Sequence, residues 1–326
     1  MKVLISGASG FVGRALTPVL ITAGHTVVAT SRHSGADLPG VVMKKVAGLG
    51  PDTDWRAALE GIEAVVHLAA RVHIMNDTAT DPLLENRRIN TQGTIKLAED
   101  AALAGVKRFV FLSTVKVMGE ATTGAPFCQS DTPSPQDAYA IAKLEAEQAL
   151  ADISTRTGMQ VVIIRPPLVY GPGVGGNFAT LLKVCARGWP LPLGAVNNRR
   201  SLIYVGNLAH AIAECVENPA ATGKTYLVRD GEDISTAELI TRISAALDHA
   251  GLPGRRPQLW PLPPVLLRLA AGLVGKSGAA SRLLGDLGVD DGAIRKDLDW
   301  TPPFSMVQGL NETANFFAAA KMDRHE

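Results

Sequence analysis

The stretch that decides the fold is Val3-Leu4-Ile5-Ser6-Gly7-Ala8-Ser9-Gly10-Phe11-Val12-Gly13. Its apolar beginning predicts a short buried strand, and the pattern of residues 14–24 predicts a helix. Glycines at positions 7, 10 and 13 let the backbone turn tightly and approach a pyrophosphate. The phosphates would then lie at the helix N-terminus, where free N–H groups and the macrodipole favour negative charge. The stretch therefore predicts a dinucleotide-binding fold.

The following part of the chain continues this alternation of strand and helix. Near-continuous apolar runs predict strands at Val3–Ser6, Thr26–Ser31, Val41–Val46, Ala64–Leu68, Arg108–Leu112 and Val161–Arg165. Helical patterns lie between them, around residues 14–24, 54–60, 88–104 and 139–157. Strands that are apolar throughout are typical of a parallel sheet with helices on both faces. We expect an α/β fold over residues 1–165, a doubly wound parallel sheet of the Rossmann type.

The composition of the sequence changes after Pro166, where prolines, glycines and long predicted loops become frequent. We expect residues 166–326 to form a smaller, partly interleaved C-terminal substrate domain, because long loops at strand ends usually bind the ligand. The most apolar tract, Leu259–Val274, is interrupted by three prolines and Arg268 and is too short to span a bilayer. We expect a helix buried against the substrate domain there, with peripheral membrane contact left open.

Composition and charge argue against several classes of protein. The 326 residues are 46% hydrophobic with a formal net charge of +1, so neither disorder nor a nucleic-acid partner is expected. Cys128, Cys185 and Cys215 have no metal-like spacing and predict reduced thiols in a cytoplasmic protein. We expect no signal peptide, no integral membrane segment and no catalytic metal.

Tyr139 and Lys143 are four residues apart in a helical stretch, so both side chains lie on one helix face. An ammonium group near a phenol favours ionisation of the phenol. Reduction of a ketone needs a hydride on carbon and a proton on oxygen, and a phenol with an ordinary pKa of about 10 needs help to exchange that proton near neutral pH. Together with the glycine-rich loop, the pair predicts hydride transfer at a carbon that bears oxygen.

The end of the second predicted strand bears on which cofactor is used. Ser31, followed by Arg32, stands where NAD-preferring sites usually have a carboxylate for the ribose 2′-hydroxyl. A hydroxyl and a guanidinium would instead hold a 2′-phosphate. We therefore expect NADP(H), with NAD(H) as the alternative. The end of the fourth strand, Leu68-Ala69-Ala70, carries small residues that would let the backbone approach this cofactor.

Seven landmarks, in this order, resemble the extended short-chain dehydrogenase/reductases, the branch that acts largely on nucleotide sugars. They are Gly7–Gly13, His67–Ala70, Asn90–Thr94, Phe111–Thr114, Tyr139-x-x-x-Lys143, Arg165–Gly173 and Arg200–Val205. The resemblance implies that Asn90 and Pro166 also contact the cofactor. It further implies a homodimer formed through the helices around 88–104 and 139–157.

The same resemblance implies roles for individual residues. Tyr139 would be the acid/base, Lys143 would lower its pKa and hold the nicotinamide ribose, and Thr114 would hydrogen-bond the reacting sugar oxygen. The residues implied for the diphosphate and uridine of a UDP-sugar are Asn177, Arg200 and Arg282.

The choice of reaction rests on finer resemblances. Related 4,6-dehydratases carry an Asp-Glu pair after the active-site threonine, whereas this chain has Val115-Lys116, so dehydration is disfavoured. The tracts Ala70–Pro82 and Pro190–Ser201 look most like bacterial UDP-4-keto-6-deoxy-N-acetylhexosamine reductases. We therefore expect NAD(P)H-dependent reduction of a C4 ketone in surface-polysaccharide biosynthesis. The alternatives are a UDP-hexose or UDP-N-acetylhexosamine 4-epimerase with tightly bound NAD, and a non-catalytic NADP-sensing protein.

Overall fold

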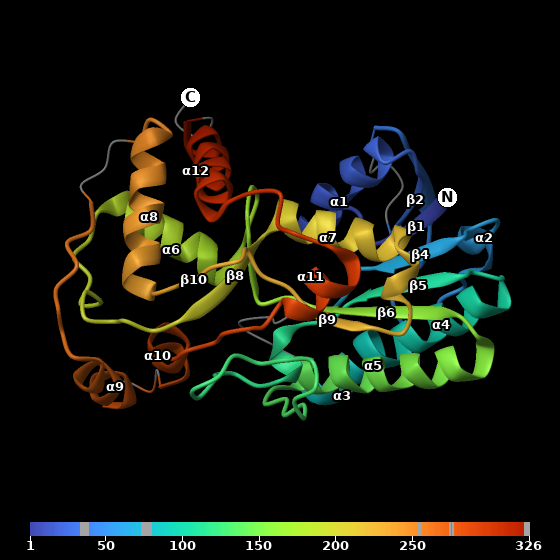
Figure 1. Cartoon of the computed structure of the whole chain (residues 1–326), viewed down its shortest axis with the longest axis horizontal. Helices are drawn as coiled ribbons and strands as arrows, with labels where there is room; N and C mark the ends of the chain where they lie inside the picture. The colour runs from blue at the N-terminus through green and yellow to red at the C-terminus, as the bar shows by residue number, and fades with distance from the viewer. Residues whose placement is uncertain (33–38, 73–79, 253–255, 274, 276, 323–326) are drawn as a thin grey trace.

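A parallel β-sheet with helices packed on it forms the larger part of the computed structural model, which describes residues 1–32, 39–72, 80–252, 256–273, 275 and 277–322 (Figure 1). Within those ranges it has seven strands in the order β3-β2-β1-β4-β5-β6-β9, and neighbouring strands are parallel throughout. The strands are β1 Lys2–Ser6, β2 Thr26–Ser31, β3 Val41–Lys45, β4 Ala64–His67, β5 Arg108–Leu112, β6 Gln160–Arg165 and β9 Thr225–Leu227. The expected doubly wound α/β fold is confirmed.

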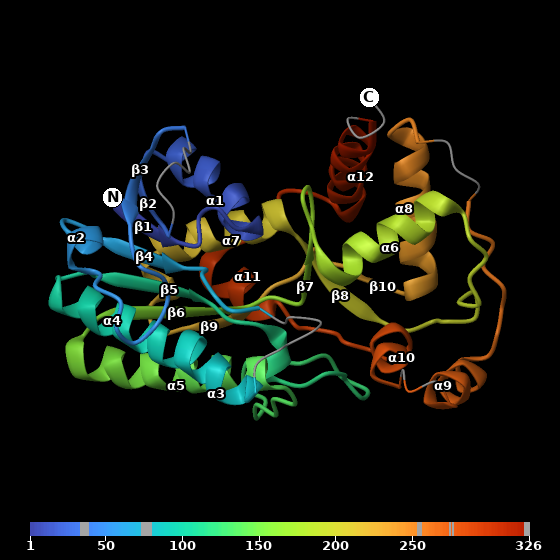
Figure 2. The same ribbon diagram turned by 180° about the vertical axis from the view of Figure 1, so that it is seen from behind.

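Helices cover both faces of this sheet (Figure 2). On one face, α1 (Phe11–Thr22) packs against α7 (Val205–Glu217). On the other face lie α4 (Gly93–Leu103) and α5 (Ala138–Thr157), with the short α2 (Arg56–Leu59) at one end. Side chains of β1 alternate between the two cores, since Val3 and Ile5 pack on the α1 side and Leu4 on the α4 side. This burial on both faces explains why the strands are apolar throughout.

The helix expected around residues 88–104 is longer and less regular than its pattern suggests. It begins with α3 (Pro82–Asn86), whose first turn is capped by the Asp81 carboxylate. A π-helical segment, η1 (Arg87–Gln92), then joins α3 to α4. Such π segments occur mostly as single turns within helices and frequently at functional sites.

A second, smaller sheet lies beyond the carboxyl ends of the large one. In the described part of the chain it contains β7 (Leu168–Tyr170), β8 (Arg200–Tyr204) and β10 (Asp233–Ile234). A separate core joins it to α6 (Gly176–Arg187), α8 (Thr236–His249) and α12 (Met306–Met322). The chain returns to the large sheet between β8 and β10 for α7, η3 (Pro219–Ala221) and β9, and again later for α11 (Gly292–Leu298). The boundary near residue 165 stays a prediction.

The apolar tract that ends near residue 274 differs from our expectation. It contains α9 (Pro264–Leu273), and none of the ten residues of this helix, all of them described, is buried. With α10 (Ser277–Leu284), α9 lies at the end of the molecule away from the large sheet (Figures 1 and 2). The expectation of a buried helix was therefore wrong. The physical reason lies in the segment before α9. Residues that precede prolines avoid the α region, so residues 260–263 form an exposed, non-helical segment. Across the described ranges, no helix combines the length and the apolar character needed to cross a membrane.

Candidate active site

The glycine-rich loop between β1 and α1 has the geometry that a dinucleotide pyrophosphate requires. Gly7 has a φ of +84°, and a Cβ there would lie 2.8 Å from the backbone N of Ala69. A Cβ at Gly13 would collide with the carbonyl oxygen of Gly7. No described side chain caps α1, and its first turn contains no acidic residue. Its first N–H groups therefore remain available to an anion, and the loop fits the expected cofactor.

His67 lies beneath this loop in a chain of buried hydrogen bonds. Thr94 donates its hydroxyl proton to the carbonyl of Asn90 (2.6 Å), so it can only accept from Nε2 of His67 (2.9 Å). Nδ1 of His67 is then unprotonated and accepts from the Ser6 hydroxyl at 2.5 Å. Burial, and secondarily the charge of Lys143, lower the pKa of His67 to about 3. His67 is therefore a neutral residue that packs and orients its neighbours.

Asn90 holds the segment that follows β4. Its amide nitrogen donates to the carbonyl of Arg71 and to the side-chain oxygen of Asn86, each at 2.9 Å. Its amide oxygen accepts from the backbone N–H of Arg71 at 2.7 Å. The π-helical η1 thus fixes the chain directly after Leu68-Ala69-Ala70. The cofactor contacts expected from these four residues stay predictions, and residues 73–79 of the Ala70–Pro82 tract lie outside the described residues.

Thr114, Tyr139 and Lys143 come from two elements that meet at the carboxyl end of the large sheet. Thr114 follows β5 and starts the short helix η2 (Val115–Val117), where its hydroxyl accepts from the backbone N–H of Lys116 at 3.3 Å. Tyr139 and Lys143 lie on the first two turns of α5. The Lys143 ammonium donates to the carbonyl of Leu112 at 2.8 Å, which joins α5 to the end of β5. Pro166 is also in this region, because its carbonyl accepts from the backbone N–H of Val115.

The electrostatics of this pair differ from the sequence-based expectation. Burial lowers the pKa of Lys143 to about 7, although Glu147 acts in the opposite direction. Burial raises the pKa of Tyr139 above its ordinary value, and the nearby Asp137 carboxylate raises it further. Desolvation of the phenolate is thus the main influence on the Tyr139 pKa. The Tyr139 phenol holds its proton until further positive charge is brought beside it.

A buried ion pair supports α5 one turn beyond Lys143. The Arg165 guanidinium, at the end of β6, donates two hydrogen bonds to the Glu147 carboxylate, at 2.5 and 3.1 Å, and both side chains are buried. A third donor of Arg165 meets the sulfur of Met118. Sequence reasoning missed Glu147. The signal was a carboxylate four residues after Lys143, together with an arginine at the end of an otherwise apolar strand.

Lys116 forms a second link between the two elements. Its ammonium lies 2.6 Å from the Asp137 carboxylate and 3.2 Å from that of Glu120. Asp137 also caps α5 by accepting from the backbone N–H of Ala140. Lys116 is therefore ion-paired and ties the turn after Thr114 to the start of the helix that carries Tyr139.

The residues expected to bind the nucleotide sugar lie in the smaller part of the molecule. Arg200 begins β8 and donates to the carbonyl of Gly285 at 3.0 Å, and burial lowers its pKa. Arg199 is exposed and pairs with Asp233, so Arg200 is the inward member of the pair. Arg282 lies on α10, three residues before Gly285, and Asn177 is exposed on the first turn of α6. No hydrogen bond or ion pair among the described residues joins Asn177 to either arginine, and all three substrate roles stay predictions.

The end of β2 suggests a test of cofactor choice. Ser31 is half-buried, and the exposed Arg32 has no ion-pair partner among the described residues. Lys45 of β3 is the register partner of Ser31 and adds a second cation at this edge.

Arg32→Ala should weaken NADP(H) binding by roughly 10- to 100-fold, because a charge-assisted hydrogen bond to a 2′-phosphate is lost. NAD(H), which lacks that phosphate, should lose little. Calorimetric titration with both cofactors checks this, and equal losses would contradict the role of Arg32.

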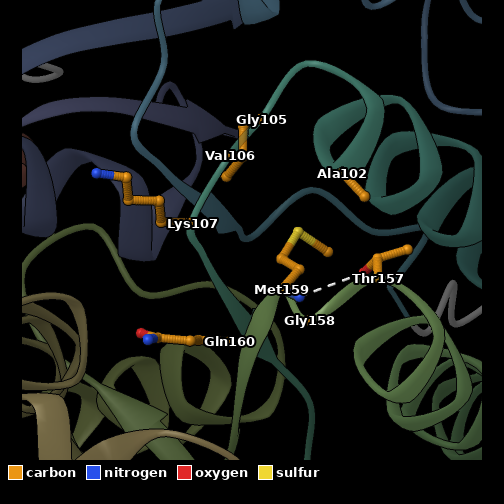
Figure 3. Close-up of a pocket in the computed structure, with 8 residues that line it drawn as sticks. All are labelled: Ala102, Gly105, Val106, Lys107, Thr157, Gly158, Met159 and Gln160. Atoms are coloured by element: carbon orange, nitrogen blue, oxygen red, sulfur yellow. Dashed lines mark hydrogen bonds between the residues drawn. The ribbon is translucent and has the colours of Figure 1, made fainter.

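Two surface hollows lie away from these residues. One of about 290 Å³ is at the amino ends of β5 and β6, opposite the edge that carries Thr114 (Figure 3). It is lined by Ala102, Gly105, Val106, Lys107, Thr157, Gly158, Met159 and Gln160. Another, of about 530 Å³, lies between Arg229–Glu232 and Thr301–Met306. Neither hollow coincides with the candidate active site. The described residues also contain no cluster of histidine, cysteine and carboxylate side chains that could hold a metal ion.

Comparison with known proteins gives consistent matches over nearly the whole chain. The family model described as "NAD dependent epimerase/dehydratase family" matches residues 3–228. A UDP-glucose 4-epimerase of Vibrio cholerae is 38% identical over 323 residues, which cover 98% of this chain and 96% of that protein. A UDP-glucose 4-epimerase of Mycolicibacterium smegmatis is 26% identical over 97% and 98% of the two chains. Among solved structures, a UDP-glucuronic acid 4-epimerase of Bacillus cereus in complex with NAD has the same fold, with a TM-score of 0.77, 19% identity and coverage of 98% and 99%.

Proposed function

The chain belongs to the NAD-dependent epimerase/dehydratase family of extended short-chain dehydrogenase/reductases, and on this basis we propose that it is a UDP-sugar 4-epimerase that uses NAD. The observation that carries the proposal is the 38% identity, over 98% of the chain, to the Vibrio cholerae UDP-glucose 4-epimerase. This favours the epimerase alternative over the C4 ketoreductase that we expected from the sequence. The substrate would be a UDP-hexose or a UDP-N-acetylhexosamine.

Epimerisation at C4 could be carried out by bound NAD together with Thr114, Tyr139 and Lys143. The glycine-rich loop and Lys143 would hold NAD, which would supply hydride transfer at C4; inversion requires that the 4-keto sugar turn over, so that its other face receives the hydride. Once ionised to the phenolate, Tyr139 would accept the proton of the C4 hydroxyl and later give it back to the ketone oxygen, while Thr114 would hold that oxygen by a hydrogen bond. Because burial keeps the pKa of Tyr139 high, the phenol needs positive charge beside it. The Lys143 ammonium and the positively charged nicotinamide ring of NAD would together supply that charge.

Incubation of the purified chain with UDP-glucose or UDP-N-acetylglucosamine, without added cofactor, tests the proposal. Interconversion of the gluco and galacto sugars, followed by NMR, is the expected result. Stoichiometric loss of NADPH absorbance with UDP-4-keto-6-deoxy-N-acetylglucosamine would instead establish the reductase, which Ser31 and Arg32 favour. If neither reaction occurs, the non-catalytic, NADP-sensing alternative gains support.

Arg200→Ala should raise KM for the UDP-sugar by roughly 10- to 100-fold and leave kcat nearly unchanged, because a guanidinium can donate two hydrogen bonds to a diphosphate. Arg199→Ala is the matched control, since this neighbouring arginine is exposed and pairs with Asp233. Initial rates over a range of substrate concentrations give both constants. An unchanged KM in the Arg200 variant would contradict its role in diphosphate binding.

Family resemblance also supports three further expectations. They are a homodimer through α4 and α5, a role in surface-polysaccharide biosynthesis and a location in the cytoplasm. Sedimentation velocity of the purified chain tests the first of these directly.

A further inference from the structure

α9 presents an apolar stripe to solvent. The side chains of this stripe are exposed by 67%, 50%, 62% and 90%, for Val265, Leu266, Leu269 and Leu273 respectively. With 3.6 residues per turn, these four positions fall within a sector of roughly 100°. The part-buried residues of the helix lie on the opposite side and are Pro264, Leu267 and Ala271.

An ordinary surface helix buries its apolar residues and exposes polar ones, whereas α9 exposes four of its large apolar residues. Trp260 and Leu262, immediately before α9, are exposed as well. Both views place α9 beside α10 at an extremity of the molecule (Figures 1 and 2). A contiguous exposed apolar surface of this kind marks an interaction site.

The charge of this region indicates what it contacts. No aspartate or glutamate occurs between His249 and Gly285. Arg268 is exposed on α9 itself. The same stretch of sequence also contains Arg255, Arg256, Lys276 and Arg282, of which Arg256 pairs with Asp248. Leucines and a tryptophan combined with arginines and no acidic residue are typical of a helix that lies in the interface of an anionic bilayer.

A second copy of the chain suits this surface less well. In a twofold contact the same patch faces itself, so Arg268 of each copy would approach the other. The segment supplies no carboxylate to compensate for that repulsion. An anionic lipid headgroup has the opposite charge and meets no such penalty.

We propose that α9 docks on the surface of an anionic lipid bilayer. Val265, Leu266, Leu269 and Leu273 enter the headgroup region, and Arg268 lies among the lipid phosphates. Arg200 donates to the carbonyl of Gly285, which directly follows α10, so docking brings the predicted sugar-nucleotide side of the molecule toward the membrane. The inference does not depend on which reaction the chain catalyses.

Co-sedimentation of the full chain with vesicles of phosphatidylcholine, with and without phosphatidylglycerol, tests the proposal. The native chain should sediment with the anionic vesicles only, and less so as salt is added. The double variant Leu266→Ser, Leu269→Ser should lower the partition coefficient by at least about tenfold, because two leucines no longer leave water. Arg268→Gln should also weaken binding.

The matched control is the double variant Val42→Ser, Val307→Ser, which removes two exposed apolar side chains from β3 and α12 and should bind as the native chain does. Absence of binding by the native chain would overturn the proposal, and so would undiminished binding by the Leu266, Leu269 variant. Sedimentation velocity without lipid supplies a third arm. A native dimer that this variant dissociates would show that a second copy covers α9, and would also overturn the proposal.

Discussion

Tyr139→Phe is expected to lower kcat by roughly 10²- to 10⁴-fold, the range by which a positioned proton donor or acceptor accelerates a reaction. Only the phenol oxygen is removed, so the packing of α5 and the hydrogen bond from Lys143 to the carbonyl of Leu112 should persist. Cofactor affinity should therefore change little. Steady-state kinetics with the UDP-sugar and calorimetric titration with NAD measure the two quantities separately.

Two controls make this result specific. Tyr204→Phe removes a phenol oxygen from β8, in the smaller sheet, and should retain activity. Lys143→Met should lose both turnover and cofactor affinity, because this lysine is predicted to hold the nicotinamide ribose. Full activity of the Tyr139 variant would remove Tyr139 from the proposed mechanism.

The second large effect is on stability. Glu147→Ala should lower the free energy of unfolding by about 3–5 kcal/mol, because it leaves the Arg165 guanidinium buried without its carboxylate. The variant should also lose activity, since β6 and α5 meet through this pair next to Lys143. Denaturant unfolding, with the slope compared between variants, measures the change.

Two further variants distinguish the effect of leaving a charge buried from the effect of losing an ion pair. Glu99 and Arg156 form an exposed pair at 3.5 Å, and Glu99→Ala should cost less than about 1 kcal/mol. The double variant Glu147→Leu, Arg165→Leu should recover much of the lost stability, because no unpaired charge then remains buried. If Glu147→Ala and Glu99→Ala lowered the free energy of unfolding equally, the buried pair would stabilise the protein no more than the exposed one.

Much of the large sheet could be predicted from sequence because burial on both faces leaves a simple pattern. Six of its seven strands match the apolar runs to within one residue at either end. The exception is β9, whose three residues are too few to form a recognisable run. The small sheet could not be recognised as a sheet for the same reason, because two of its three strands, β7 and β10, have only three and two residues.

Other features depend on partners that are distant in sequence. The π-helical turn is associated with the Asn90 amide bound to Arg71, a contact that local periodicity does not encode. The exposure of α9 depends on whether a neighbouring surface exists to receive it, so an apolar tract alone predicts burial. In the candidate site, the positions of Tyr139 and Lys143 on one helix were predictable. The upward shift of the Tyr139 pKa could not be predicted, because it depends on how deeply the tertiary structure buries the phenol.

The late position of β9 has a consequence for synthesis on the ribosome. β6 ends at Arg165, but the strand that covers its open edge begins at Thr225. At about 5–20 residues per second, the nascent chain carries an uncovered β6 for roughly 3–12 s. During that time the N–H and C=O groups along that edge can pair with another polypeptide. We expect slowed translation of residues 166–227, or depletion of chaperones that bind nascent chains, to increase aggregation of this protein.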